Sequence, residues 1–120
     1  MTESSELVEM AVASLEDLKA RDVTILDVSR LTSITDYMVI ASGTSGRHVK
    51  SIADRLVERA KAEGYSPVGV EGAEGAEWVL VDLQDVVVHV MQPKVREFYN
   101  LEKLWNMGGD APGSSAGAGA

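Results

Sequence analysis

The segment DYMVIASGTSGRHVKSIADRLVERA, residues 36–60, contains the pattern that decides the fold class of this chain. Its first part, residues 36–42, is apolar at successive positions, which is typical of a central strand covered on both faces. Its last part is apolar at helical spacing, at Val49, Ile52, Ala53, Leu56, Val57 and Ala60. The segment therefore predicts a buried strand, a short turn and an amphipathic helix.

Two interpretations fit the turn SGTSGRH between that strand and that helix. In the first, free N–H groups at the start of the helix bind a phosphate. The residues of this anion site would be Gly43, Ser45, Gly46 and Arg47. In the second, Thr44 or Ser45 caps the helix and the glycines only make the turn. The spacings G-x-x-x-x-G-K-[ST] and G-x-G-x-x-G are both absent, so the cap is favoured, and a small nucleotide-binding transferase is the alternative function.

The regions on either side predict two more helices and four more strands. The helices are expected at about residues 5–18 and 93–105, and the strands at 22–28, 68–70, 77–82 and 85–91. The last two strands are separated by a turn at Asp82 to Asp85, which indicates a hairpin. The element order is α-β-β-α-β-β-β-α. Helical crossovers together with a hairpin imply an α/β (α+β) fold, with a mixed five-stranded sheet flanked by helices.

One domain accounts for nearly all of the chain. Its 120 residues suffice for a single modest core, which we assign to residues 1–106. The remainder, MGGDAPGSSAGAGA at 107–120, consists of small and polar residues that cannot bury a core. We therefore expect a disordered tail there.

The composition excludes several classes of function. The formal net charge is -8, and this negative charge repels phosphate backbones. We therefore expect a basic protein, and not DNA, as the partner. The chain has no cysteine, which removes disulfides and thiolate chemistry. No apolar run approaches the roughly 20 residues that span a bilayer, and the acidic N-terminus does not resemble a secretory signal. We expect a cytoplasmic protein that does not bind membranes.

No group of residues suggests catalysis. The histidines His48 and His89 lack further ligands at metal-binding spacing, and His89, within VVVHVM, is more typical of a hydrogen-bonded strand residue. Asp82 and Asp85 could hold a cation, but aspartate is also a common turn residue. No G-x-S-x-G motif is present. We therefore predict no enzyme activity, no metal and no cofactor.

Trp78 is the residue that best suggests a binding surface. It begins the strand EWVLVD after the acidic segment EGAEGA, which we expect to be a flexible link. Because side chains alternate along a strand, Trp78, Leu80 and Asp82 share one face. The neighbouring acids are Glu71, Glu74, Glu77, Asp82 and Asp85. An aromatic anchor with a charged rim is typical of a protein-binding patch, and this rim favours a basic partner.

Three blocks of the sequence, in this order, resemble the bacterial ribosomal silencing factor, or Iojap, family. They are the D-Y-x-V-I-x-x-G-x-S block, the E-G…E-W-x-L-x-D block, and V-H-V with its extension R-x-F-Y-x-L-E-K-L-W. The resemblance covers about residues 5–106. It implies a nucleotidyltransferase-like fold without the catalytic residues, which would explain the resemblance of the turn at Gly43 to a phosphate loop.

The resemblance also implies a partner and a function. Proteins of this family bind ribosomal protein L-fourteen of the large ribosomal subunit and block joining with the small subunit when nutrients are scarce. The family's contact tryptophan matches Trp78, and we extend the contact to Leu80 and Val81 by resemblance. The charge argument adds Asp82, Glu77 and Glu71. A homodimer is a further expectation, because the edges of a small sheet invite pairing.

Overall fold

The structure is a computed structural model that describes residues 3–104. Trp105 and the predicted tail at 107–120 lie outside the described residues. The elements are α1 (Glu3–Asp17), β1 (Arg21–Asp27), β2 (Tyr37–Ser42), α2 (Gly46–Ala62), β3 (Gly69–Glu71), β4 (Trp78–Asp82), β5 (Val86–Met91) and α3 (Pro93–Tyr99). The predicted order α-β-β-α-β-β-β-α is confirmed.

The five strands form one mixed sheet in the order β1-β2-β5-β4-β3. β2 and β5 pair in parallel, and the other neighbouring pairs are antiparallel. β2 and β5 are therefore interior strands, which explains why residues 37–42 and 86–91 are apolar almost throughout. The mixed five-stranded sheet is as predicted.

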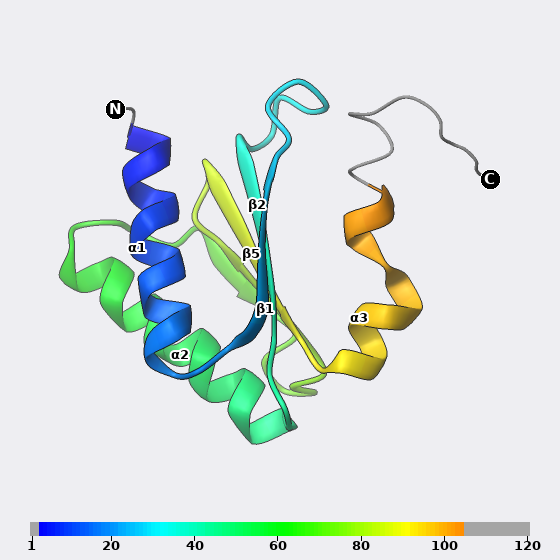
Figure 1. Cartoon of the computed structure of the whole chain (residues 1–120). Coiled ribbons are helices and arrows are strands. Elements are labelled where there is room, and N and C mark those ends of the chain that lie inside the picture. The colour runs from blue at the N-terminus through cyan, green and yellow to red at the C-terminus, as the bar shows by residue number, and fades with distance from the viewer. Residues whose placement is uncertain (1–2, 105–120) are drawn as a thin grey trace.

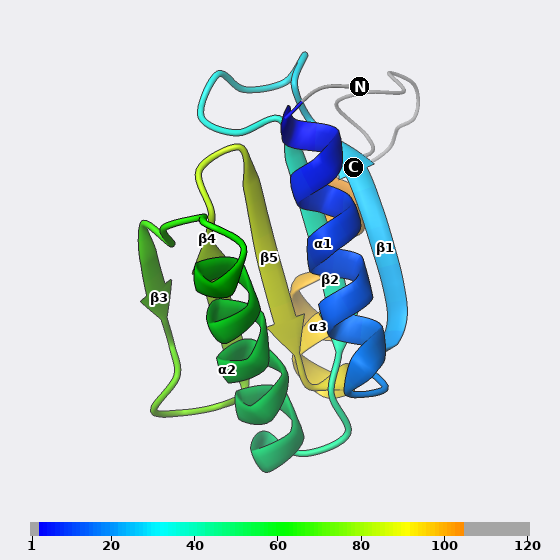
Figure 2. The ribbon, with the colours of Figure 1, turned by 90° about the vertical axis from the view of Figure 1, so that its left-hand side faces the viewer.

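The helices lie on both faces of the sheet. Figure 1 shows the sheet nearly edge-on, with α1 and α2 on one face and α3 on the other. In Figure 2 α1 and α2 lie side by side in front of the strands, and α3 lies behind them. The molecule thus has three layers, and in the described part of the chain the α3 face is covered by the seven-residue α3 and the helical turn at residues 101–104.

The core divides into two clusters that follow the alternation of the strands. The larger cluster lies between the sheet and the pair α1 and α2, and it includes Val79 and Val81 of β4. The smaller cluster lies on the α3 face and consists of Leu26, Val28, Met38, Ile40 and Met91, with Trp78 and Leu101 packed against it. Leu80 and Val87 are only partly buried. The short helix therefore leaves part of this face accessible.

Residues 71–76, which were expected to be a flexible link, have a defined turn conformation in the structure. They form a turn in which the Ala76 N–H donates to the carbonyl oxygen of Gly72 at 3.1 Å. The Gln92 side-chain amide donates to the Ala76 carbonyl oxygen, also at 3.1 Å. Gly72 has a φ of 85°, a conformation that glycine adopts without strain. The turn fixes the point at which β4 begins.

The terminal helix is shorter than predicted. α3 ends at Tyr99, because Asn100 adopts a left-handed conformation with a φ of 48°. Residues 101–104 then form a separate helical turn. This break redirects the chain so that Leu101 packs against the smaller core cluster while Phe98 stays exposed.

Candidate functional site

β4 separates the predicted contact residues onto two faces of the sheet. Trp78, Leu80 and Asp82 are half-buried and lie on the α3 face, as the alternation predicts. Val81 lies on the other face, in the core beneath the helices, with 0% of its surface exposed. The assignment of Val81 as a contact residue is therefore wrong, because no partner can reach it in this fold.

The indole of Trp78 is held between two other rings. Its Nε1–H donates a hydrogen bond to Nδ1 of His89 at 3.0 Å. Its ring centroid lies 4.9 Å from that of Tyr99 and 5.8 Å from that of His89. Both tilted arrangements lie within the range of favourable aromatic contacts. Trp78 is thus a half-buried anchor in a defined orientation.

His89 lies beneath this surface on β5, with 5% of its surface exposed. Because Nδ1 accepts the indole hydrogen bond, the neutral ring carries its proton on Nε2. Nε2 is buried, and among the described residues it has no hydrogen-bond partner. Burial lowers the pKa of His89 from 6.5 to about 4, because the charged form loses its hydration. The interpretation of His89 as a hydrogen-bonded strand residue is confirmed at Nδ1.

Acidification is expected to destabilise the fold through His89. The folded-state pKa of about 4 is below the ordinary value of 6.5, so the unfolded chain binds more protons between these values. From about pH 7 to pH 5, His89 alone should lower the free energy of unfolding by about 2 kcal/mol. Urea titrations across this range measure the effect. The non-titrating variant His89→Phe is the control, and an equal pH dependence in both proteins would contradict the prediction.

Two aromatic residues of α3 extend the surface around Trp78, and the sequence analysis did not assign them to it. Tyr99 and Phe98 are 53% and 79% exposed. Their rings meet edge to face, with centroids 5.0 Å apart. Adjacent residues point about 100° apart on a helix, so the pair FY gave no local signal of which ring would face the core. We call Trp78, Leu80, Phe98 and Tyr99 the aromatic surface.

The acids of the expected rim differ in their availability. Glu71 is exposed and lies opposite Leu80 in the β3–β4 register, so it borders the aromatic surface. Glu77 is also exposed. Asp82 accepts a hydrogen bond from the Gln84 N–H at 2.8 Å, which confirms that it stabilises the hairpin turn. Of the expected rim acids, Glu71, Glu74 and Glu77 have exposed side chains.

The turn at Gly43 functions as a helix cap. The side chain of Ser45 accepts from the His48 N–H at 3.1 Å, and Nδ1 of His48 accepts from the Thr44 N–H at 2.9 Å. The Gly43 N–H donates to the carbonyl oxygen of Met91. The N–H groups of Gly43, Thr44 and His48 therefore bond within the protein and are not available to bind a phosphate. A Cβ at Gly43 would lie 2.8 Å from Cγ2 of Val49, so close packing alone explains this glycine.

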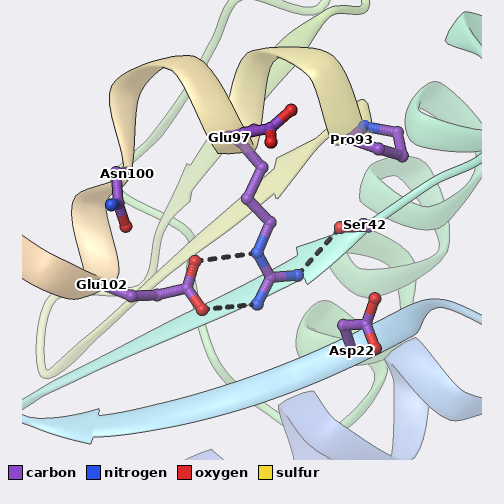
Figure 3. A pocket seen from close by; sticks show the side chains of 7 residues that line it. Asp22, Ser42, Pro93, Glu97, Asn100 and Glu102 are labelled. Carbon is purple, nitrogen blue, oxygen red and sulfur yellow. Dashed lines mark hydrogen bonds and ion pairs between the residues drawn. The ribbon is translucent and has the colours of Figure 1, made fainter.

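A pocket of about 370 Å³ lies along α3, between this helix and strands β1 and β2. Arg96 lines this pocket, and Figure 3 shows two of its hydrogen-bond partners, Ser42 and Glu102. Its Nε and Nη2 donate to the two carboxylate oxygens of Glu102, each at 2.9 Å, and its Nη1 donates to Oγ of Ser42 at 2.8 Å. Nη2 also reaches Oγ1 of Thr24 at 3.1 Å. The hydrogen bonds from Arg96 lower the pKa of the Glu102 carboxyl below its usual range, and the bonds from Arg96 to Ser42 and Thr24 tie α3 to the sheet.

Metal and membrane features are not found in the described part of the chain. Residues 3–104 contain no group of three or more His, Cys, Asp or Glu side chains placed to hold a metal ion. None of the helices described there has the length and hydrophobicity that crossing a bilayer requires. The side chains that distinguish the molecule are those of the aromatic surface and its acidic neighbours.

The fold and the site define a class: an α/β protein with a mixed sheet and an acid-bordered aromatic surface suited to binding another macromolecule. A family model described as "Ribosomal silencing factor during starvation" matches residues 1–117. The chain belongs to this family of ribosomal silencing factors, which confirms the resemblance inferred from its three sequence blocks.

Individual relatives agree with this assignment. "Ribosomal silencing factor RsfS" of Chromobacterium violaceum is 47% identical over 116 residues, which cover 97% of this chain and 93% of the relative. A crystal structure of a protein from the same organism has a TM-score of 0.86 at 46% identity, covering 98% of this chain and 96% of the other. The mouse protein "Mitochondrial assembly of ribosomal large subunit protein 1" is 37% identical, covering 83% of this chain and 45% of the relative.

Proposed function

We propose that this protein represses translation by binding ribosomal protein L-fourteen on the large ribosomal subunit, and thereby blocks joining with the small subunit when nutrients are scarce. The observation that carries the proposal is the oriented Trp78 within an aromatic surface, in a chain of the ribosomal silencing factor family. The mechanism is steric: a bound protein occupies the space that the small subunit needs. It requires no catalysis and no cofactor, and it takes place in the cytoplasm.

The chemistry of the surface favours a basic protein as the partner. A large aromatic side chain at the centre of an interface provides much of the binding energy, while polar residues at the rim provide orientation. Glu71, opposite Leu80 in the β3–β4 register, and Glu77, which precedes Trp78 in the sequence, are exposed. The net charge of -8 attracts a basic partner at long range. The name of the mouse relative refers to the ribosomal large subunit, which supports that subunit as the target.

We expect Trp78→Ala to weaken binding to isolated large subunits by about 30-fold or more, which corresponds to ~2 kcal/mol for the loss of a central aromatic anchor. Co-sedimentation with purified subunits measures the affinity. In the same preparation, wild-type protein should reduce the formation of joined ribosomes on a sucrose gradient.

The matched control is Ile25→Ala. Ile25 is 48% exposed but pairs with Val39, whose side chain faces α1 and α2, so it lies on the opposite face from Trp78. This variant should bind as wild type does. Circular dichroism at the assay temperature must show that both variants are folded. Wild-type affinity in folded Trp78→Ala would reject the aromatic surface as the docking site.

Two further expectations remain proposals. A transferase that uses the turn Gly43–Arg47 is disfavoured, because the N–H groups of Gly43 and Thr44 donate to Met91 and His48. For the homodimer, the sheet has two edge strands, β1 and β3. A dimer that covered Trp78 would compete with binding to the ribosome.

A further inference from the structure

The hydrogen bond between Trp78 and His89 joins the aromatic surface to the interior of the sheet. Trp78 lies opposite Met91 and His89 lies opposite Leu80 in the β4–β5 register, so the two residues are diagonal neighbours on the α3 face. Their 3.0 Å hydrogen bond uses the single donor of the indole. Because the indole nitrogen is off-centre on the ring, this bond distinguishes one orientation of the side chain from the others.

A histidine at position 89 destabilises the fold if its side chain only fills space in the core. Its Nε2 is buried and, within residues 3–104, has no hydrogen-bond partner. A buried donor without a partner destabilises a fold, whereas an apolar side chain of similar shape would not. Among residues 3–104, the one polar contact of this side chain is the bond to Trp78. A role directed at the indole accounts for an imidazole at this position.

The indole is constrained from the opposite side as well. Tyr99 of α3 contacts it, with ring centroids 4.9 Å apart. α3 is itself held against the sheet by the bonds of Arg96 to Ser42 and Thr24. Trp78 therefore lies between a buried strand residue and a residue of an anchored helix. An anchor held in this way loses little conformational freedom when it binds.

We propose that His89 is a positioning residue for docking: through its Nδ1 it fixes the orientation of the Trp78 indole, so that the anchor is preorganised before the partner arrives. At 5% exposure His89 does not itself touch the partner. This inference rests on the proposed function, in which the surface around Trp78 is the docking site.

The first experiment needs no ribosomes. In ¹⁵N-labelled protein the two tryptophans give two indole N–H signals, and Trp78→Phe identifies the one that belongs to Trp78. We expect this proton to exchange slowly with water in the wild type and at least tenfold faster in His89→Phe. His89→Asn, whose Oδ1 can replace Nδ1 as the acceptor, should restore part of the protection. Equally fast exchange in wild type and His89→Phe would overturn the inference.

The second experiment tests whether the orientation of the indole contributes to the affinity for large subunits. His89→Phe should remain as stable as the wild type near neutral pH, yet bind purified large subunits about tenfold more weakly, as expected for ordering one large side chain on binding. In the Trp78→Phe background, which has no indole N–H, the same substitution should change the affinity by less than about twofold. An undiminished effect in that background would overturn the positioning role.

The outcomes separate this inference from the proposed function. If Trp78→Ala binds large subunits as wild type does, the docking proposal fails, and the exchange measurement still decides whether His89 holds the indole. If Trp78→Ala binds weakly while His89→Phe binds normally, docking through Trp78 stands and the positioning role is overturned.

Discussion

Gly72→Ala is expected to lower the free energy of unfolding by about 4 kcal/mol, since it combines backbone strain with a steric collision. The φ of Gly72 is 85°, which side chains of L-residues rarely adopt. A Cβ at this position would also collide with the carbonyl oxygen of Trp78. That oxygen belongs to the backbone of β4, so it cannot move aside as the end of a side chain can. Chemical denaturation followed by circular dichroism measures the loss.

The consequence extends to the binding surface, because the collision occurs at the first residue of β4. Any fraction of Gly72→Ala that remains folded must displace Trp78, and with it the bond to His89. We therefore expect weaker binding to large subunits even at temperatures where the variant is folded.

Gly75→Ala is the matched control within the same turn. A Cβ at Gly75 would have no heavy atom within 4 Å, and its φ is not in the left-handed region. Its stability should stay within about 1 kcal/mol of the wild type, with a small gain because alanine restricts the unfolded chain. If the two substitutions destabilise the protein equally, the turn is not held by the constraint described at Gly72.

Arg96→Met is expected to lower the free energy of unfolding by about 3 kcal/mol, the order of magnitude seen when one partner of a largely buried ion pair is removed. The Arg96 side chain is 11% exposed and Glu102 is 29% exposed. Methionine keeps much of the apolar stem of arginine. The loss of stability therefore measures the contribution of the bonds to Glu102, Ser42 and Thr24. Lys94→Met, an exposed position on the same helix, should change stability by less than about 0.5 kcal/mol.

The pH dependence provides an internal test of the Arg96 prediction. Arg96 holds the pKa of Glu102 below its ordinary value of 4.5. A lowered carboxyl pKa contributes stability that is present above the unfolded pKa and is lost as the pH falls through the folded one. The stability difference between wild type and Arg96→Met should therefore narrow below about pH 4. If the stability difference between the two proteins stays constant down to pH 3, the ion pair of Arg96 with Glu102 is not the source of that difference.

Much of the candidate site could be predicted from local pattern. The two-residue period of EWVLVD placed Trp78 and Leu80 on one face and Val81 on the other, and the structure agrees with this alternation. Assigning Val81 to the contact by resemblance went against that alternation and was wrong. The Ser45 cap and the hairpin turn at Asp82 were predicted correctly, because both depend on hydrogen bonds between residues two or three positions apart.

Contacts between distant residues were not predictable in the same way. The turn at residues 71–76 is ordered by Gln92, sixteen positions from Ala76 along the chain. The bond from Trp78 to His89 depends on the register of β4 and β5. The contact of Tyr99 with the indole depends on where α3 docks. No local pattern encodes any of these, because each arises from the packing of separate elements.

The sequence by itself determined the elements, their order and the residues with an apolar face, because backbone propensity, capping and periodic burial act over a few neighbouring positions. Only the tertiary structure decided the parallel pairing of β2 with β5, the partial cover that α3 gives its face, and the orientation of Trp78. These features depend on how whole helices and strands pack against one another and on which buried polar groups form hydrogen bonds between them. Such contacts exist only once the chain is folded.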